Sequence, residues 1–382
     1  MWYLSLLVGG RERAPAVDKG PASRYRGDML GLRPLPRTLE ACLRDIVSPR
    51  MEARAEASEE LGRHLSGGVD EAVRARGVAA LEKALGDTHP AVRSRAATAL
   101  ADAQAVTALP KLLVAVEDDD AFVRQMALSA LGELGDRRAA TKLERALSDT
   151  RPEVRYQAVI ALVRVAPEEA ARAITRALGD DDPAVRHIAL RLAEDDIERG
   201  REPSPEHLRA AERLLTDEHP DVSVAAAILL ARARGESLPE KARAVLLAVV
   251  RGDLRGKVGT EEEQGAIEAC GEAALREAIP ALETRAYGLM RLVRQTSEAH
   301  AKSALAALGH ARATSDLLAE LGASSPEARA RAIVAVGRAR LEAARGRLTA
   351  LANEPATRDL AEEALARLAD RARPEGSSEG EA

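Results

Sequence analysis

Apolar residues recur at helical spacing within short runs along most of the chain. Leu143 and Leu147 lie four residues apart, and so do Val154 and Ala158. Such spacing places side chains on one face of an α-helix. Residues 148–152 (Ser-Asp-Thr-Arg-Pro) separate the two runs and are of types that cap or begin helices. The pattern therefore predicts two short helices joined by a tight turn.

The same pattern returns at a constant step along part of the chain. The dipeptide Val-Arg begins at residues 92, 123, 154 and 185, a step of 31. Further columns keep this step: Asp87, Asp118, Asp149 and Asp180; Leu81, Leu112, Leu143 and Ile174; Leu85, Val116, Leu147 and Leu178; Ala96, Ala127, Ala158 and Ala189. One helical hairpin cannot bury its own apolar face, so neighbouring units must stack. We expect a repeat array.

Beyond residue 190 the regularity decays. Ser223 stands where the repeat has Arg, and Glu262 and Glu263 stand at a later Val-Arg position. We expect nine or ten hairpins between about residues 39 and 370. The predicted segments are a partly disordered extension at 1–38, regular repeats at 39–200, irregular repeats at 201–296, C-terminal repeats at 297–372 and a disordered acidic tail at 373–382.

The motif Asp-x-x-x-x-Val-Arg resembles the HEAT repeat, in particular the short bacterial form of the phycobilisome-lyase type. This resemblance implies an all-α fold, a right-handed α-α superhelix. It also implies a ladder in which turn Asp and second-helix Arg side chains connect adjacent repeats. The residues that would form it are Asp87, Arg93, Asp118, Arg124, Asp149, Arg155, Asp180 and Arg186. The tetratricopeptide and ankyrin patterns are disfavoured, because their signature residues are missing.

Composition agrees with a helical array and narrows the possible partners. Only six residues are aromatic, whereas Ala, Leu and Val dominate the apolar mass, which suits closely packed helices. The net charge of −5 and the pI of about 6.0 disfavour general binding of nucleic acid. No apolar run is long enough to span a membrane. The first eight residues do not resemble a secretory signal, so we expect a cytoplasmic protein.

Enzyme and cofactor motifs are weak or missing in the sequence. Related deoxyhypusine hydroxylases bind iron through His-Glu dipeptides, which do not occur here. Alkylpurine glycosylases of this type need aromatic and basic groove residues, and bilin lyases offer no residue that can be matched to a tetrapyrrole. We expect no cofactor, no metal and no catalysis. A small-molecule or tetrapyrrole-binding protein and a nucleic-acid-binding protein remain the alternatives to a protein-interaction scaffold.

The second helix of each unit is expected to line the concave face and to carry the partner site. The residue after each Val-Arg, together with the residues four and eight positions further on, is expected to face away from the core. Several of these residues form a patch with the composition of binding hot spots. Its members are Gln125, Tyr156, Ile160, Arg164, His187 and Arg191. Phe122, the sole Phe, is a candidate second anchor. We expect a protein partner there.

Overall fold

The computed structural model describes residues 37–288 and 297–370, and every regular element within these ranges is helical. Within these ranges, twenty α-helices pair in chain order into ten hairpins, which confirms the predicted all-α superhelix. The first helices of the hairpins are α2 (Leu39–Asp45), α4 (Glu71–Ala84), α6 (Leu109–Ala115), α8 (Ala140–Ala146), α10 (Ala170–Ala177), α12 (Pro205–Leu214), α14 (Glu240–Arg251), α16 (Ile279–Tyr287), α18 (Ala311–Glu320) and α20 (Arg345–Leu351).

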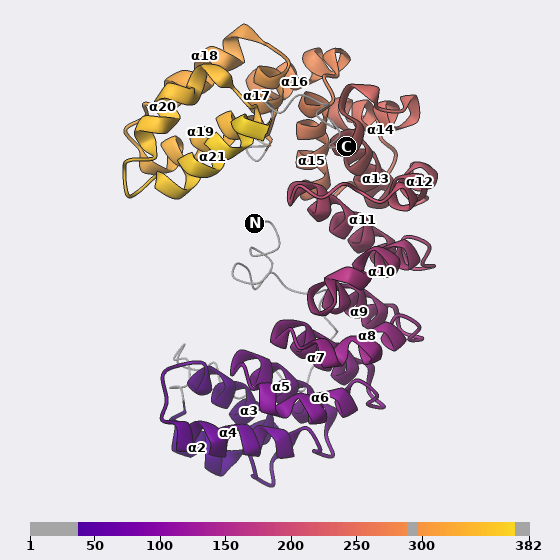
Figure 1. Cartoon of the computed structure of the whole chain (residues 1–382), viewed down its shortest axis with the longest axis vertical. Helices are drawn as coiled ribbons and strands as arrows, with labels where there is room; N and C mark the ends of the chain where they lie inside the picture. Colours follow the sequence, from indigo (N-terminus) through magenta and orange to yellow (C-terminus); the bar gives the residue numbers. More distant parts are fainter. Residues whose placement is uncertain (1–36, 289–296, 371–382) are drawn as a thin grey trace, which may run out of the picture.

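The second helices carry the Val-Arg motif in the regular part of the array. They are α3 (Met51–Leu65), α5 (Pro90–Asp102), α7 (Ala121–Leu134), α9 (Pro152–Val165), α11 (Pro183–Glu198), α13 (Pro220–Arg234), α15 (Thr260–Glu272), α17 (Glu298–Ala307), α19 (Pro326–Arg338) and α21 (Arg358–Asp370). In Figure 1 the hairpins form an open arc, with α5, α7, α9 and α11 on its inner side and α6, α8 and α10 on its outer side. The inner face therefore consists of the second helices.

The turns between paired helices end in residues that favour the start of the second helix, either as N-caps or as proline in its first turn. Asp120 accepts hydrogen bonds from the backbone N–H groups of Phe122 and Val123 at 2.9 and 3.1 Å, and Asp182 caps α11 in the same way. Pro occupies the first turn of α9, α11 and α13, where its missing N–H costs nothing. The acidic runs at 118–120 and 180–182 are thus helix caps and ladder residues.

Small residues set the distance between successive second helices. A Cβ added to Gly62 on α3 would lie 2.7 Å from the Cα of Ala99 on α5, and one on Gly132 would lie 3.0 Å from the Cα of Ala161 on α9. These backbones therefore pack with almost no side chain between them. Such close packing explains why the chain is rich in Ala and poor in aromatic residues.

The array turns sharply at α13. This helix packs against α11, α12, α14 and α15, and an unbroken run of its residues from Val222 to Ala231 is buried. On the inner side, a Cβ at Gly265 of α15 would lie 2.9 Å from the Cδ1 atom of Ile228. The hairpins continue through residues 201–288, where the sequence is irregular. Residues 1–36, 289–296 and 371–382, which include most of the predicted extension and tail, lie outside the described residues.

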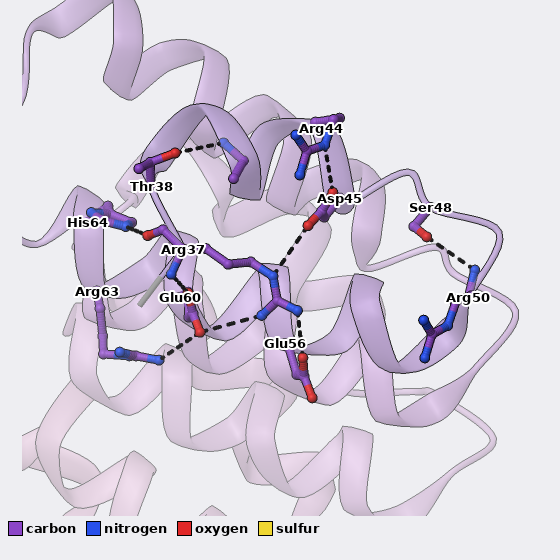
Figure 2. Close-up of polar contacts among 11 residues, drawn as sticks. Arg37, Thr38, Arg44, Asp45, Ser48, Arg50, Glu56, Glu60, Arg63 and His64 are labelled. Carbon is purple, nitrogen blue, oxygen red and sulfur yellow. Dashed lines mark hydrogen bonds and ion pairs between the residues drawn. The ribbon is translucent and has the colours of Figure 1, made fainter. Parts of the chain in front are cut away.

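The described part of the chain begins with a residue fixed to the first hairpin. The Arg37 guanidinium contacts Glu56 at 2.7 Å, Asp45 at 3.3 Å and Glu60 at 3.4 Å. Its backbone N–H donates to Glu60, and its carbonyl oxygen lies 2.8 Å from the Nε2 atom of His64. Figure 2 shows these groups converging on Arg37 from α2 and α3. Arg37, directly before α2, is therefore fixed to both helices of the first hairpin.

No helix among the described residues is both long and apolar enough to cross a membrane.

Candidate functional site: the inner face of the array

The regular repeats are joined by a ladder of ion pairs. Arg155 donates from Nε and Nη2 to both carboxylate oxygens of Asp180 in the next turn, at 2.7 and 2.6 Å, and from Nη1 to the Asp149 carbonyl oxygen of its own turn at 3.0 Å. The same bidentate pairing recurs along the array. The five pairs are Arg54–Asp87, Arg93–Asp118, Arg124–Asp149, Arg155–Asp180 and Arg186–Asp217. Each arginine therefore fixes two consecutive turns.

The ladder carboxylates are held in their charged form. Burial alone raises the pKa of Asp118, Asp149 and Asp180, but the paired arginine and a backbone N–H two residues further on outweigh burial. The pKa of each therefore lies below its ordinary value. The sequence analysis predicted eight of these ten ladder residues and did not include Arg54 and Asp217. The turn containing Asp217 and the early Arg54 unit were visible in the sequence, but their pairing across repeats was not.

The ladder ends where Ser223 replaces the arginine, and a second charged network on the second helices continues from there. Arg191 and Glu194 of α11 lie 2.5 Å apart, and Glu194 pairs with Arg232 of α13 at 2.5 Å. Arg232 also contacts Glu198 at 2.6 Å. Burial lowers the pKa of Arg232, but the surrounding carboxylates outweigh burial and raise it above the usual value. Arg232, whose side chain is 14% exposed, is thus a largely enclosed, charged link between hairpins.

The same network reaches the C-terminal repeats through Glu268 of α15. Its Oε1 atom lies 2.5 Å from Nδ1 of His300 on α17 and 2.8 Å from Nη1 of Arg338 on α19. Burial raises the pKa of Glu268, but these two neighbours outweigh it and the pKa is lowered. In addition, His187 of α11 lies 2.8 Å from Glu262 of α15. Side chains of α11, α13, α15, α17 and α19 are therefore connected by charge.

An open surface remains on the inner side of α3, α5, α7 and α9. Its residues stand two before, and two, five and nine after, each ladder arginine, a spacing that keeps them on one face of a helix. We call this surface the inner ridge; it consists of Glu52, Glu56, Glu59, Arg63, Ala91, Arg95, Thr98, Asp102, Phe122, Met126, Ser129, Glu133, Glu153, Gln157, Ile160 and Arg164. None of them is buried. On α11 and α13 the corresponding positions are partly closed, since Ile188 and Ile228 are buried.

The predicted partner residues are only partly on this ridge. Phe122, Ile160 and Arg164 belong to it, whereas Gln125 and Tyr156 lie one residue to the side of it and are partly buried. The sequence-based reading took the residue after each ladder arginine as outward-facing, which is wrong for Ser94, because that position turns toward the neighbouring repeat and Ser94 is buried. The outward position is the next one, which carries Met126 on α7.

Two predicted partner residues are instead engaged within the chain. The Arg191 side chain is only 13% exposed and pairs with buried Glu194. His187 is held by Glu262 across the turn of the array. The expectation that Arg191 is an exposed contact residue is therefore wrong, because its charge is used to link helices. The engagement of His187 could not be predicted, since Glu262 lies outside the regular repeats, whereas Glu194 stands three residues after Arg191 on the same helix.

Apolar residues on the ridge and directly beside it are found on α7 and α9. Phe122 is 56% exposed, and Met126, one turn further along α7, is half-buried. Tyr156 and Ile160 of α9 pack partly against the core and are also half-buried. Burial, followed by the negative charge of Glu261, raises the pKa of Tyr156. We call these four residues the apolar cluster. An exposed aromatic residue beside Met and Ile is typical of a contact surface.

Three carboxylates of the ridge lie near one another on α3, α5 and α7. Burial raises the pKa of Asp102, and the charge of Glu59 raises it further. Burial and the charge of Asp102 likewise raise the pKa of Glu133. Arg63 and Arg164 counteract these effects without cancelling them. We call Glu59, Asp102 and Glu133 the acidic row; of its members, Glu59 also pairs with Arg95 at 3.3 Å and with Arg63 at 3.9 Å.

The described residues offer little for chemistry with metals. Nowhere in residues 37–288 and 297–370 do three His, Cys, Asp or Glu side chains gather closely enough to hold a metal ion. Cys42 and Cys270 are both buried and unpaired, and burial raises the pKa of their thiols to about 11 and about 12. Both thiols are therefore protonated at neutral pH.

Comparison with known proteins shows which repeat type part of the chain matches and which solved structures have a similar fold. A sequence profile of HEAT repeats matches residues 78–162 and 142–195. No curated protein sequence matches the chain. The structure of YibA from E. coli is similar with a TM-score of 0.52 at 17% identity, over 72% of this chain and 93% of that one. At this identity the similarity concerns the fold alone.

Two further structures align over most of this chain with lower scores. The complex of CpcE and CpcF of phycocyanin lyase from Nostoc sp. PCC7120 is 20% identical over 70% of this chain and 97% of that one, with a TM-score of 0.39. Kap121p bound to Pho4p is 12% identical over 86% of this chain and 41% of that one, with a TM-score of 0.46.

Proposed function

We propose that this chain, in which residues 78–162 and 142–195 match a profile of HEAT repeats, is a non-catalytic scaffold that binds a protein partner on the inner ridge of α3, α5, α7 and α9. The observation that carries the proposal is the apolar cluster on α7 and α9, two helices on the inner side of the arc (Figure 1), with Phe122 56% exposed. In the isolated chain Phe122 is exposed to water, so burying it against a partner would stabilise the complex.

The ladder and the charged network support this role by making the array stiff. Each ladder arginine bonds to its own turn and to the next one, so relative rotation of neighbouring hairpins would break several hydrogen bonds at once. A stiff surface loses little conformational entropy on binding, which favours affinity. The inner ridge places apolar residues among charged ones, as protein interfaces do with their apolar core and polar rim.

The test compares three full-length proteins as bait in a lysate of the native host. The Phe122→Ser, Ile160→Ser variant removes the apolar anchors, and Val114→Ser, on the outer helix α6, is the matched control because Val114 is 71% exposed. We expect one protein to be captured by wild type and by the control but lost from the inner variant. Equal capture by all three would place the partner site elsewhere.

A further inference from the structure

The inner ridge combines an exposed apolar residue with a net negative charge. The apolar cluster exposes Phe122 to solvent, and the ridge carries six carboxylates (Glu52, Glu56, Glu59, Asp102, Glu133 and Glu153) against three arginines (Arg63, Arg95 and Arg164). A segment that is both cationic and rich in large apolar residues would relieve both at once. The ridge therefore fits a segment that is both cationic and apolar.

Residues 1–36 of this chain have that chemistry. They contain six Lys or Arg residues against three Asp or Glu residues, whereas the whole chain has a net charge of −5. They also contain three of the six aromatic residues of the chain, Trp2, Tyr3 and Tyr25. The run from Met1 to Val8 is almost entirely apolar. The segment thus complements the ridge in charge and in apolar character.

The point where this segment joins the array lies at the ridge itself. Arg37 contacts Glu56, a residue of the ridge on α3, at 2.7 Å, and also Glu60 of the same helix (Figure 2). Side-chain hydrogen bonding to Glu56 is the largest cause that raises the pKa of Arg37. The first basic residue in the described part of the chain is thus already bound to an acid of the ridge. Residues 1–36 are joined to the array at this position.

The segment is long enough to reach the apolar cluster. An extended chain spans about 3.3 Å per residue, so 36 residues reach on the order of 100 Å. Neighbouring packed helices lie about 8–10 Å apart, so α7 and α9, two and three helices along from α3, are roughly 16–30 Å from it. Tethering at Arg37 also raises the effective concentration of the segment at the ridge, so a weak contact suffices to keep it bound.

We propose that residues 1–36 occupy the inner ridge in the absence of a partner, with Trp2 on the apolar cluster and the basic residues along the acidic row, and so inhibit partner binding. This proposal rests on the proposed function in that it treats the ridge as a binding surface. A protein partner must then displace the chain's own segment, and it will do so when its contacts with Phe122 and the acidic row are stronger.

The sole tryptophan of the chain reports directly on this contact. Trp2 fluorescence is recorded in the full chain and compared with that of a synthetic peptide of residues 1–36. Phe122→Ser and Glu133→Lys alter the apolar cluster and the acidic row. Their matched controls are Val114→Ser and Glu202→Lys, both exposed and away from the ridge. Circular dichroism establishes that each variant keeps the helical content of the wild type.

We expect the Trp2 emission maximum of the wild type and of both controls to lie to the blue of the free peptide, and that of both ridge variants to shift back toward it. Emission equal to that of the free peptide in the wild type overturns the inference, and so does a blue shift that all four variants retain. If Trp2 is undocked while the ridge still captures a partner, only this inference fails. If Trp2 is docked but no partner is captured either by the wild type or by a Trp2→Ala variant, in which the segment is undocked, the proposed function fails.

Discussion

Glu194 of α11 and Arg232 of α13 form an ion pair with 2.5 Å between Oε1 and Nη1, and the Glu194 side chain is almost completely buried. Glu194 stands eight residues after a ladder position. In the other repeats this column holds only small or apolar residues: Gly62, Ala101, Gly132, Val163, Ala231, Gly271 and Gly337. Packing alone would place a small side chain here, so the carboxylate is present for its charge contacts with Arg191 and Arg232.

Glu194→Ala should destabilise the chain by about 3 kcal/mol, because it leaves two arginines without a buried partner. Glu198→Ala is the matched control, since Glu198 also contacts Arg232 but is 44% exposed. The control should change the free energy of unfolding by less than about 1 kcal/mol. Urea unfolding of both variants measures the difference. Equal losses would mean that burial of Glu194 does not matter.

Arg155→Ala should lower the free energy of unfolding by about 2 kcal/mol, because Asp180 loses a bidentate partner and two turns lose their link. Both side chains of this pair are less than a fifth exposed. Arg151→Ala, four residues earlier in the same repeat, is the control: Arg151 is 59% exposed and contacts Glu153 at 3.6 Å. Thermal melts should separate the two variants. A melting temperature of Arg155→Ala equal to that of the control would contradict a stabilising ladder.

The ladder should also make the array sensitive to acid. The pKa of each ladder Asp is lower in the folded chain than in the unfolded chain, so these groups stabilise the fold above about pH 4. That stabilisation is lost as the pH falls through their folded pKa values. Urea unfolding at several pH values should show stability declining below about pH 4.

The control for this pH effect is Asp149→Asn, which removes one titrating ladder group. Its free energy of unfolding should be lower than that of the wild type at neutral pH and should fall less steeply with acidification. An identical slope for wild type and variant would show that Asp149 titrates alike in both states.

Gly62→Ala should destabilise the array although Ala is the better helix former. The added Cβ would lie 2.7 Å from both Cα and Cβ of Ala99, so α3 and α5 must move apart. Gly346→Ala on α20 is the control, because its new Cβ meets nothing within 4 Å. The control should gain up to about 1 kcal/mol from helix propensity. Chemical denaturation of both variants should give changes of opposite sign; a gain in both would contradict the close approach.

The fold and the ladder could be predicted because both repeat with the sequence. The 31-residue step fixes which residues share a face, and the Asp and Arg columns identify the groups that link repeats. The charged network around Arg232 could not be predicted, since its members occupy different columns in different repeats. A Glu in a column of Gly and Ala, as at position 194, was nevertheless a visible signal of a buried charge.

The candidate surface was predicted only in part, because the outward-facing column was misplaced by one residue. Phe122 and Ile160 are on the ridge, but Met126 was missed and Arg191 was included although it is internally paired. A helix packed on both sides exposes a narrow strip, so an error of one residue rotates a prediction from solvent into a neighbouring helix. The effect of the turn at α13 on α11 could not be seen from local spacing.

The most direct test of the inner ridge as a partner site is photo-crosslinking from single positions. A photoreactive amino acid replaces Phe122 in one full-length protein and Val114 in another, and both are irradiated in lysate of the native host. We predict a discrete cross-linked protein from position 122 and none from position 114, even though Val114 is the more exposed of the two. The same cross-linked protein from both positions, or one from position 114 alone, would contradict the account.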